Sequence, residues 1–217
     1  FVVVIMVLSA CSSKNPETDA LIEKKLNEIT AAKSPYAVSK YETPLLSSYS
    51  WDSIFGGPAG DTLQYDRFGE IDQLVFIAPP ETVFSLQRQV RIKTRSGAET
   101  IYYKVSTPIY RGEEPLWVDG RFLDLQDFQP KEIIKIAVPS EILKNLRSLK
   151  GIPYTWHGSS ADGAAQLLEW YPPSKLLSER SKHDWILKGF DSIGMLFRAS
   201  DGKTPLTFHD LSSFGSP

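Results

Sequence analysis

The chain has 217 residues, of which 41% are hydrophobic and 23% charged, and its formal net charge is −2 with a pI near 6.0. This composition predicts a globular protein that buries one generous core or two small ones, and it argues against extensive disorder. Lys and Arg are scattered along the chain, so nucleic acid is not an expected partner. A single cysteine excludes an internal disulfide framework, and three histidines without paired spacing indicate no metal site. We expect no cofactor.

The N-terminus has the pattern of a targeting signal. Residues 1–8 form an uninterrupted apolar run, and Leu8-Ser9-Ala10-Cys11 completes it before the chain turns polar. The run is far shorter than a membrane span and is typical of the end of a secretory hydrophobic region. Leu-Ser-Ala-Cys resembles the bacterial lipobox, whose Cys becomes the lipidated first residue. We therefore expect residues 1–11 to be the end of a lipoprotein signal peptide.

On this interpretation, a lipid on Cys11 anchors the protein to a membrane of the bacterial cell envelope, facing the periplasm or the cell wall. The alternative is a buried strand that happens to contain a Cys. Because the chain has neither a starting Met nor a charged segment before the apolar run, we expect it to begin partway into its signal peptide.

Residues 12–66 are expected to form a helix and a wrapping linker. Asn15-Pro16 is a helix start, and apolar residues at helical spacing extend the prediction to about Ala32. From residue 34 onward the segment is rich in Ser, Pro, Gly and Tyr. Its aromatic residues are too many for a free tether, so we expect them to be buried against a neighbouring domain; they are Tyr36, Tyr41, Tyr49, Trp51, Phe55 and Tyr65.

Residues 67–128 carry the signals of short strands. Five segments are β-branched or aromatic and are separated by turn residues: Leu74–Ile77, Val83–Leu86, Val90–Lys93, Ile101–Val105 and Leu116–Val118. Such short, regularly spaced strands suggest a small barrel. The end of the segment, Pro115-Leu116-Trp117-Val118-Asp119-Gly120, resembles the end of bacterial SH3-type domains, where a Trp-Val pair closes the barrel before a Gly turn. The alternative is an unrelated small β module.

A second helix is predicted from Ser140, with Gly151 as its C-terminal cap. It leads into an aromatic loop, Gly151-Ile152-Pro153-Tyr154-Thr155-Trp156-His157-Gly158. A second motif, Gly189-Phe190-Asp191-Ser192-Ile193-Gly194-Met195-Leu196, reads as a tight turn that opens directly into a helix. A turn of this kind is a place for a nucleophile, because a helix N-terminus stabilises developing negative charge.

The two motifs together resemble the NlpC-type cell-wall peptidases. The first is similar to their Gly-x-Pro-Tyr-x-Trp-Gly-Gly-x-Ser segment, and the second to their Gly-x-Asp-Cys-Ser-Gly-Leu turn. The resemblance covers roughly residues 143–211, and an SH3-like module is a common companion. It implies an α+β fold: a small SH3-like β-barrel followed, over residues 129–217, by the N-terminal part of a papain-like NlpC-type domain.

The resemblance also implies a cysteine endopeptidase that acts on peptidoglycan stem peptides, usually at a γ-D-glutamyl linkage to a diamino acid. In such a site a thiolate attacks the amide, a His is the general base and a third polar residue orients it. Carried over residue by residue, Ser192 falls on the nucleophile position. Tyr154, Trp156 and Asp191 fall on substrate-binding positions, and Asp191 matches the Asp that faces the substrate's amino group.

The departures from the family pattern concern the chemistry. Ser192 replaces the catalytic Cys, and a serine hydroxyl needs a well-aligned base that a thiol does not need to the same degree. The family's base lies on a later strand, and we expect His157, His183 and His209 to be ordinary loop histidines. On the sequence alone, Ser192 is better interpreted as a plain N-cap of the helix than as a nucleophile. The site is therefore expected to be inactive.

Three functions remain open on the sequence. The first is an anchored endopeptidase homologue, incomplete and inactive, because no convincing run of strands follows Tyr154 and the chain stops at Pro217. The second is a non-catalytic lipoprotein that binds peptidoglycan. The third is an adaptor lipoprotein without a cell-wall ligand.

Overall fold

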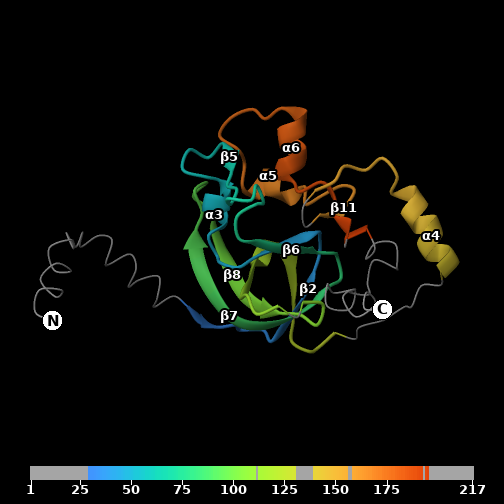
Figure 1. The fold of residues 1–217 in the computed structure, drawn as a ribbon. Coiled ribbons are helices and arrows are strands. Elements are labelled where there is room, and N and C mark those ends of the chain that lie inside the picture. The colour runs from blue at the N-terminus through green and yellow to red at the C-terminus, as the bar shows by residue number, and fades with distance from the viewer. Residues whose placement is uncertain (1–28, 111, 131–138, 156–157, 193, 196–217) are drawn as a thin grey trace, which may run out of the picture.

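The protein is described here by a computed structural model that covers residues 29–110, 112–130, 139–155, 158–192 and 194–195. The fold is mostly β: an antiparallel sheet curls into a half-barrel, and the helices of the described residues are few and short (Figure 1).

Eight strands make up the main sheet: β1 (Thr30–Ala31), β2 (Tyr36–Ser39), β3 (Thr43–Leu46), β6 (Leu74–Ala78), β7 (Val83–Lys93), β8 (Glu99–Ser106), β9 (Leu116–Asp119) and β10 (Leu123–Gln126). Their order is β10-β2-β7-β8-β9-β3-β6, with β1 paired to β7 beside β2. Two-stranded ladders join β4 (Phe55–Gly56) to β5 (Thr62–Leu63) and β11 (Ser159–Ser160) to β12 (Gly189–Phe190). Every ladder between these strands is antiparallel, so each strand can alternate between a core side and a solvent side.

The helical segments lie outside the sheet. They are α3 (Trp51–Ile54), the 3-10 turn η1 (Gly120–Phe122), α4 (Pro139–Ser148), α5 (Gln166–Trp170) and α6 (Glu179–Trp185). Figure 1 shows α5 and α6 over one end of the half-barrel and α4 off to its side. The predicted helix from Ser140 is confirmed by α4, and Gly151 follows it with a φ of 90°. No residue of α4 is buried.

The predicted strands match β6, β7, β8 and β9, with one difference. Val83–Leu86 and Val90–Lys93 were expected to be separate strands, but they form the two halves of β7. The polar stretch between them stays in the sheet because β8 pairs with β7 along its whole length, through a register shift between Leu86 and Arg88. A bulge at that point lets the ladder continue past residues that do not alternate.

The segment expected to be a linker supplies two strands of the same sheet. β2 and β3 lie within residues 36–46, and β3 pairs with both β6 and β9. Leu45 and Leu46 are both fully buried, so β3 shows none of the alternation by which a half-buried strand is recognised in a sequence. The helix expected up to about Ala32 lies mostly outside the described residues, and Thr30–Ala31 is strand β1.

Trp51 lies at the centre of an aromatic cluster that joins distant parts of the chain. Its ring is fully buried, and its centroid lies 5.6 Å from that of Phe55, 6.1 Å from Tyr102 and 5.5 Å from Tyr171. The expected burial of aromatics from residues 34–66 is thus confirmed for Trp51 and Phe55. It is wrong for Tyr41 and Tyr65, which are 37% and 53% exposed.

Arg95, in the turn between β7 and β8, holds α3 and β4 in place. Its guanidinium donates hydrogen bonds to the backbone oxygens of Phe55 (3.2 Å) and Gly57 (3.2 Å), and its backbone N–H donates to Asp52 (2.8 Å). The guanidinium packs directly on Gly56, which has a φ of 138°. A side chain at Gly56 would overlap the guanidinium, so this contact requires glycine.

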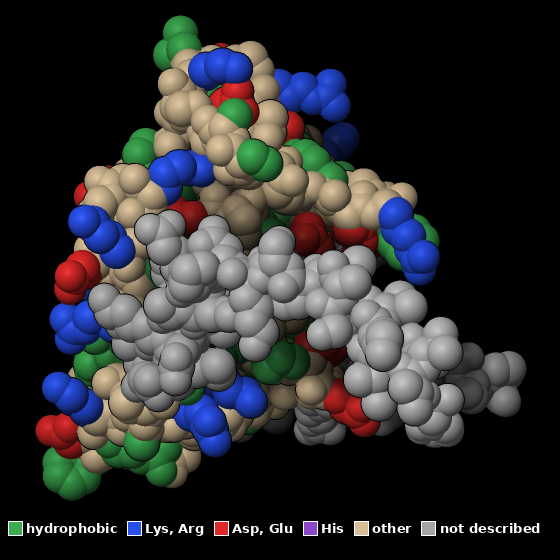
Figure 2. Space-filling view, turned by 90° about the vertical axis from the view of Figure 1, so that its left-hand side faces the viewer, with side chains coloured by type: hydrophobic (Ala, Val, Ile, Leu, Met, Phe, Trp, Pro, Cys, Tyr) green, Lys and Arg blue, Asp and Glu red, His purple; other side chains and the backbone are tan. Residues whose placement is uncertain are grey.

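Charged side chains are interspersed over the surface. Figure 2 shows basic and acidic groups alternating around the face that looks out on the left of Figure 1, without a single dominant basic patch among the coloured residues. A surface of mixed sign has no extended field of one charge to steer a polyanion.

We predict that Trp51→Ala lowers the free energy of unfolding by about 3–5 kcal/mol, as expected for a large buried aromatic side chain. The matched control is Phe68→Ala, because Phe68 is 71% exposed and its removal should change stability by less than about 0.5 kcal/mol. Chemical denaturation followed by circular dichroism measures both. Equal losses in the two variants would contradict the central position of Trp51.

Candidate functional site

The structure brings the two predicted motifs side by side. The backbone N–H of Thr155 donates to the oxygen of Phe190 (3.1 Å), and the N–H of Phe190 donates to the oxygen of Pro153 (3.1 Å). The N–H of Asp191 donates to the oxygen of Gly158 (3.0 Å). The loop after α4 and the turn after β12 are therefore one unit, although about three dozen residues separate them in the chain.

Glycines permit this close approach. Gly189 has a φ of 136°, and a Cβ added there would lie 2.4 Å from Thr155 Oγ1 and 2.5 Å from the oxygen of Pro153. A Cβ at Gly158 would lie 2.5 Å from the oxygen of Gly189. The two glycines that flank the motifs are thus required by packing between backbones, independently of any chemistry.

Asp191, and not Ser192, caps the start of the following helical turn. Its Oδ1 accepts a hydrogen bond from the N–H of Gly194 at 2.5 Å, and its backbone oxygen accepts from Met195 N at 2.9 Å. This is the pattern of an N-cap residue with its third successor. The alternative in which Ser192 is the N-cap is therefore wrong. Ser192 is exposed at the first helical position, and Asp191 is half-buried.

The other residues of the resemblance are placed only in part. Tyr154 is 61% exposed, and its backbone forms a parallel β-bridge with Phe190, next to Asp191 in the chain. Trp156, His157 and His209 lie outside the described residues, as does Cys11. His183 is half-buried in α6, where its backbone oxygen accepts a hydrogen bond from Lys188. Nothing brings His183 to Ser192 in the described contacts.

A buried carboxylate connects the segment after α5 to the half-barrel. Asp119, at the end of β9, is fully buried. Its Oδ1 accepts hydrogen bonds from Thr100 Oγ1 (2.9 Å) and from the backbone N–H of Arg121 (2.9 Å), and its Oδ2 accepts from Arg121 Nη2 (2.5 Å) and from the Tyr171 hydroxyl (2.5 Å). Because the Tyr171 hydroxyl donates its single proton to Asp119, it accepts a hydrogen bond from the Tyr102 hydroxyl (2.9 Å). The Asp119 network, as we name these five residues, thus joins β8 and β9 to the segment that follows α5.

The charges of the Asp119 network support one another. Burial alone would lower the pKa of the Arg121 guanidinium, but the hydrogen bonds and the charge of Asp119 outweigh burial and raise it. Burial, with the nearby Asp119 carboxylate, raises the pKa of Tyr171 well above its usual value. The Arg121 guanidinium also lies 4.8 Å from the Trp170 ring centroid and 5.1 Å from that of Tyr171. A buried carboxylate with a full set of donors is held in one position.

Sequence reasoning missed this network. Asp119 stood only as part of a turn after the Trp-Val pair, and Tyr171 lies 52 residues further along the chain. The one available signal was a charged pair, Asp119 and Arg121, next to a short apolar strand. Nothing in the spacing indicated that a tyrosine from the C-terminal half completes the set.

Within the described ranges, no three His, Cys, Asp or Glu side chains lie close enough together to hold a metal ion. No helix in the described part of the chain is long and apolar enough to cross a membrane.

Comparison with known proteins gave no match: no family model, no curated protein and no solved structure is similar to the chain.

We predict that Gly189→Ala lowers the free energy of unfolding by about 2–5 kcal/mol, because it adds backbone strain and overlaps Thr155 and Pro153. Gly151→Ala is the control, because Gly151 also has a positive φ (90°) but open space around its Cβ position. It should lose only about 1 kcal/mol from strain. Thermal unfolding compares the two, and equal losses would show that the motifs do not pack as described.

We predict that Tyr171→Phe lowers the free energy of unfolding at neutral pH by about 1–3 kcal/mol, because a buried carboxylate loses a donor. Folding raises the pKa of Tyr171, so its contribution is fully present below the unfolded pKa of about 10 and is lost as pH rises beyond it. The variant should therefore lose less stability than the wild type between pH 9 and 11, about one unit either side of that pKa. Tyr36→Phe is the control, because Tyr36 is half-buried in β2 outside the network. Identical pH profiles of stability for wild type and Tyr171→Phe would refute the stabilising role of the Tyr171 hydroxyl.

Proposed function

We propose that this protein is an NlpC-type cell-wall endopeptidase homologue that holds peptidoglycan stem peptides and does not cleave them. The observation that carries the proposal is the joining of the two motifs into one unit, with Asp191 as the cap and Ser192 exposed at the first position of the helical turn. That is where the resemblance places the nucleophile, and where partial positive charge from backbone N–H groups is available.

The chemistry at this position supports binding without turnover. A serine hydroxyl needs a base within hydrogen-bond reach, whereas a cysteine is already partly ionised near neutral pH. Ser192 has no described contact with a histidine, and His183 belongs to the neighbouring helix α6. The Oδ1 atom of Asp191 is engaged by Gly194, and no described residue donates to its Oδ2 atom. A half-buried carboxylate of this kind suits the amino group of a bound peptide.

The second candidate function is peptidoglycan binding without an endopeptidase ancestry. The same observation on Asp191 favours it, together with the exposed ring of Tyr154 beside Phe190. An aromatic surface next to a carboxylate can hold a peptide or a glycan without any nucleophile. The two candidates predict the same ligand and differ only in the origin of the site.

The finer fold and the location belong to the same proposal. An SH3-like barrel is supported by the curled antiparallel sheet and by the Trp117-Val118 pair in β9 directly before the Gly120 turn. A papain-like domain after it is supported by the motif unit alone. A lipid on Cys11 and a place in the bacterial envelope are supported by the sequence of residues 1–11.

We predict that the purified chain sediments with peptidoglycan sacculi and that Asp191→Asn weakens this binding about tenfold, since a charged hydrogen bond to a ligand contributes about 1.5 kcal/mol. Asparagine is as good an N-cap as aspartate, so the fold should be unchanged. Asp162→Asn, an exposed acidic residue of the same segment, is the control and should bind like the wild type. Pull-down over a concentration series measures all three.

The same preparations test turnover. Chromatography of the supernatant should show no stem-peptide fragments above the buffer level. Release of fragments would contradict the absence of cleavage. Equal binding by Asp191→Asn and the wild type would remove Asp191 from the site, and no sedimentation at all would refute both candidate functions.

A further inference from the structure

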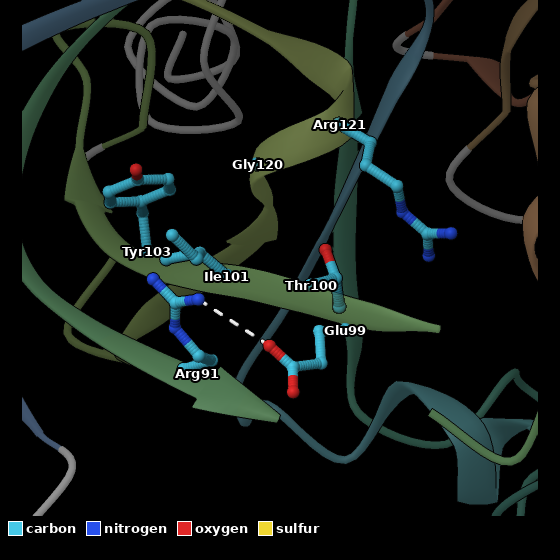
Figure 3. Close-up of a pocket in the computed structure, with 7 residues that line it drawn as sticks. All are labelled: Arg91, Glu99, Thr100, Ile101, Tyr103, Gly120 and Arg121. Atoms are coloured by element: carbon cyan, nitrogen blue, oxygen red, sulfur yellow. Dashed lines mark hydrogen bonds and ion pairs between the residues drawn. The ribbon is translucent and has the colours of Figure 1, made fainter. Parts of the chain in front are cut away.

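A shallow hollow of about 280 Å³ lies on the half-barrel where β7, β8 and η1 meet (Figure 3). Its lining residues are Arg91, Glu99, Thr100, Ile101, Tyr103, Gly120 and Arg121. None of them belongs to the two motifs described above. The hollow has room for a small polar molecule.

Two opposite charges stand at its edge. Arg91 in β7 and Glu99 in β8 form an ion pair at 3.5 Å, and their side chains are 62% and 64% exposed. A single long contact between two exposed side chains contributes little to stability, so a ligand can replace it at small cost. The two side chains are therefore positioned by the sheet, but folding does not depend on the contact between them.

The other basic group of the hollow is already engaged. The Arg121 guanidinium is bound to Asp119 and lies over the rings of Trp170 and Tyr171. Figure 3 shows it directed away from the Arg91–Glu99 pair. Arg91 is thus the cation and Glu99 the anion that the hollow presents to solvent.

The hollow also has an apolar wall. Tyr103 is 5% exposed and lies on the same face of the sheet as Arg91, beside the half-buried Ile101. Gly120 packs directly against the Tyr103 ring, because a Cβ there would lie 2.7 Å from that ring. Gln89, the register partner of Tyr103, has a buried side-chain oxygen with no partner among the described residues.

We propose that this hollow binds a small zwitterion: a molecule that carries an ammonium and a carboxylate on one carbon, with a short apolar side chain. Arg91 takes the carboxylate, Glu99 takes the ammonium, and Tyr103 and Ile101 contact the side chain. A simple anion would face Glu99 and a simple cation would face Arg91, so only a ligand with both charges satisfies the pair. Free amino acids have this chemistry, and so does the free end of a diamino acid within a peptide. The inference does not rest on the proposed function.

The test is a titration of the 15N-labelled full chain with alanine, followed by amide chemical shifts. We expect saturable shifts at the backbone of β7, β8 and η1 with a Kd on the order of 1 mM, typical of so small a ligand. N-acetylalanine lacks the ammonium and alaninamide lacks the carboxylate, and each should bind at least tenfold more weakly. Diaminopimelate and a tripeptide containing it then separate the two sources of the zwitterion. Tighter binding of the tripeptide than of alanine assigns the site to a peptide end, and the reverse assigns it to free amino acids.

Two variants and a control complete the experiment. Arg91→Gln and Glu99→Gln should each weaken alanine binding at least tenfold, whereas Arg88→Gln, an exposed residue of the same strand that pairs with Lys104, should leave it unchanged. Equal affinity for alanine, N-acetylalanine and alaninamide would overturn the proposal, as would the absence of saturable shifts at β7, β8 and η1 with every probe. Because the readout is local to this hollow, failure here leaves sedimentation with sacculi unaffected.

Discussion

The buried carboxylate of Asp119 is the constraint on which the rest of the structure depends. A charge that is fully removed from water is tolerated only when donors surround it, and here they come from three places: Thr100 in β8, Arg121 in η1 and Tyr171 after α5. Replacing any one of these donors leaves the buried carboxylate of Asp119 with one hydrogen bond fewer. The half-barrel and the C-terminal segment are therefore held in one arrangement by polar specificity, in addition to the apolar contact between Trp51 and Tyr171. Tyr171 lies between the two motifs in the chain, so the network helps to place the segment that connects them.

In the motif unit, the residues that set the backbone geometry are different from the exposed residue Ser192. Gly158 and Gly189 let the two backbones touch, and Asp191 caps the helical turn through Gly194. These are requirements of folding, and they would persist whether or not a nucleophile follows. Ser192 occupies the exposed position next to the cap without a described basic partner. Packing and capping therefore account for the shape of the motif unit without any chemistry at Ser192.

Local signals predicted part of the fold correctly. Alternation and β-branching identified β6, β8 and β9, and the pattern of Pro139-Ser140-Glu141 identified α4. They failed at β3, because a strand buried on both faces shows no alternation, and at β7, because a bulge carries polar residues through the ladder. The joining of the two motifs was anticipated only through a resemblance. The sequence could not predict that Asp191 is the cap, since Asp191 and Ser192 are both good N-cap residues by type.

The sequence by itself determined which residues can serve in each role: the apolar segments of the strands, the glycines of the motifs, a serine at the turn, and the terminal pattern that ends at Cys11. These follow from local chemistry and spacing, which are properties of short stretches. The tertiary structure alone decided that Tyr171 completes the shell of Asp119, that Trp51 unites the core, and that Arg91 and Glu99 face a common hollow. The first two depend on contacts between residues far apart in the chain, which are selected by the packing of the whole molecule, and the third depends on the register of β7 with β8.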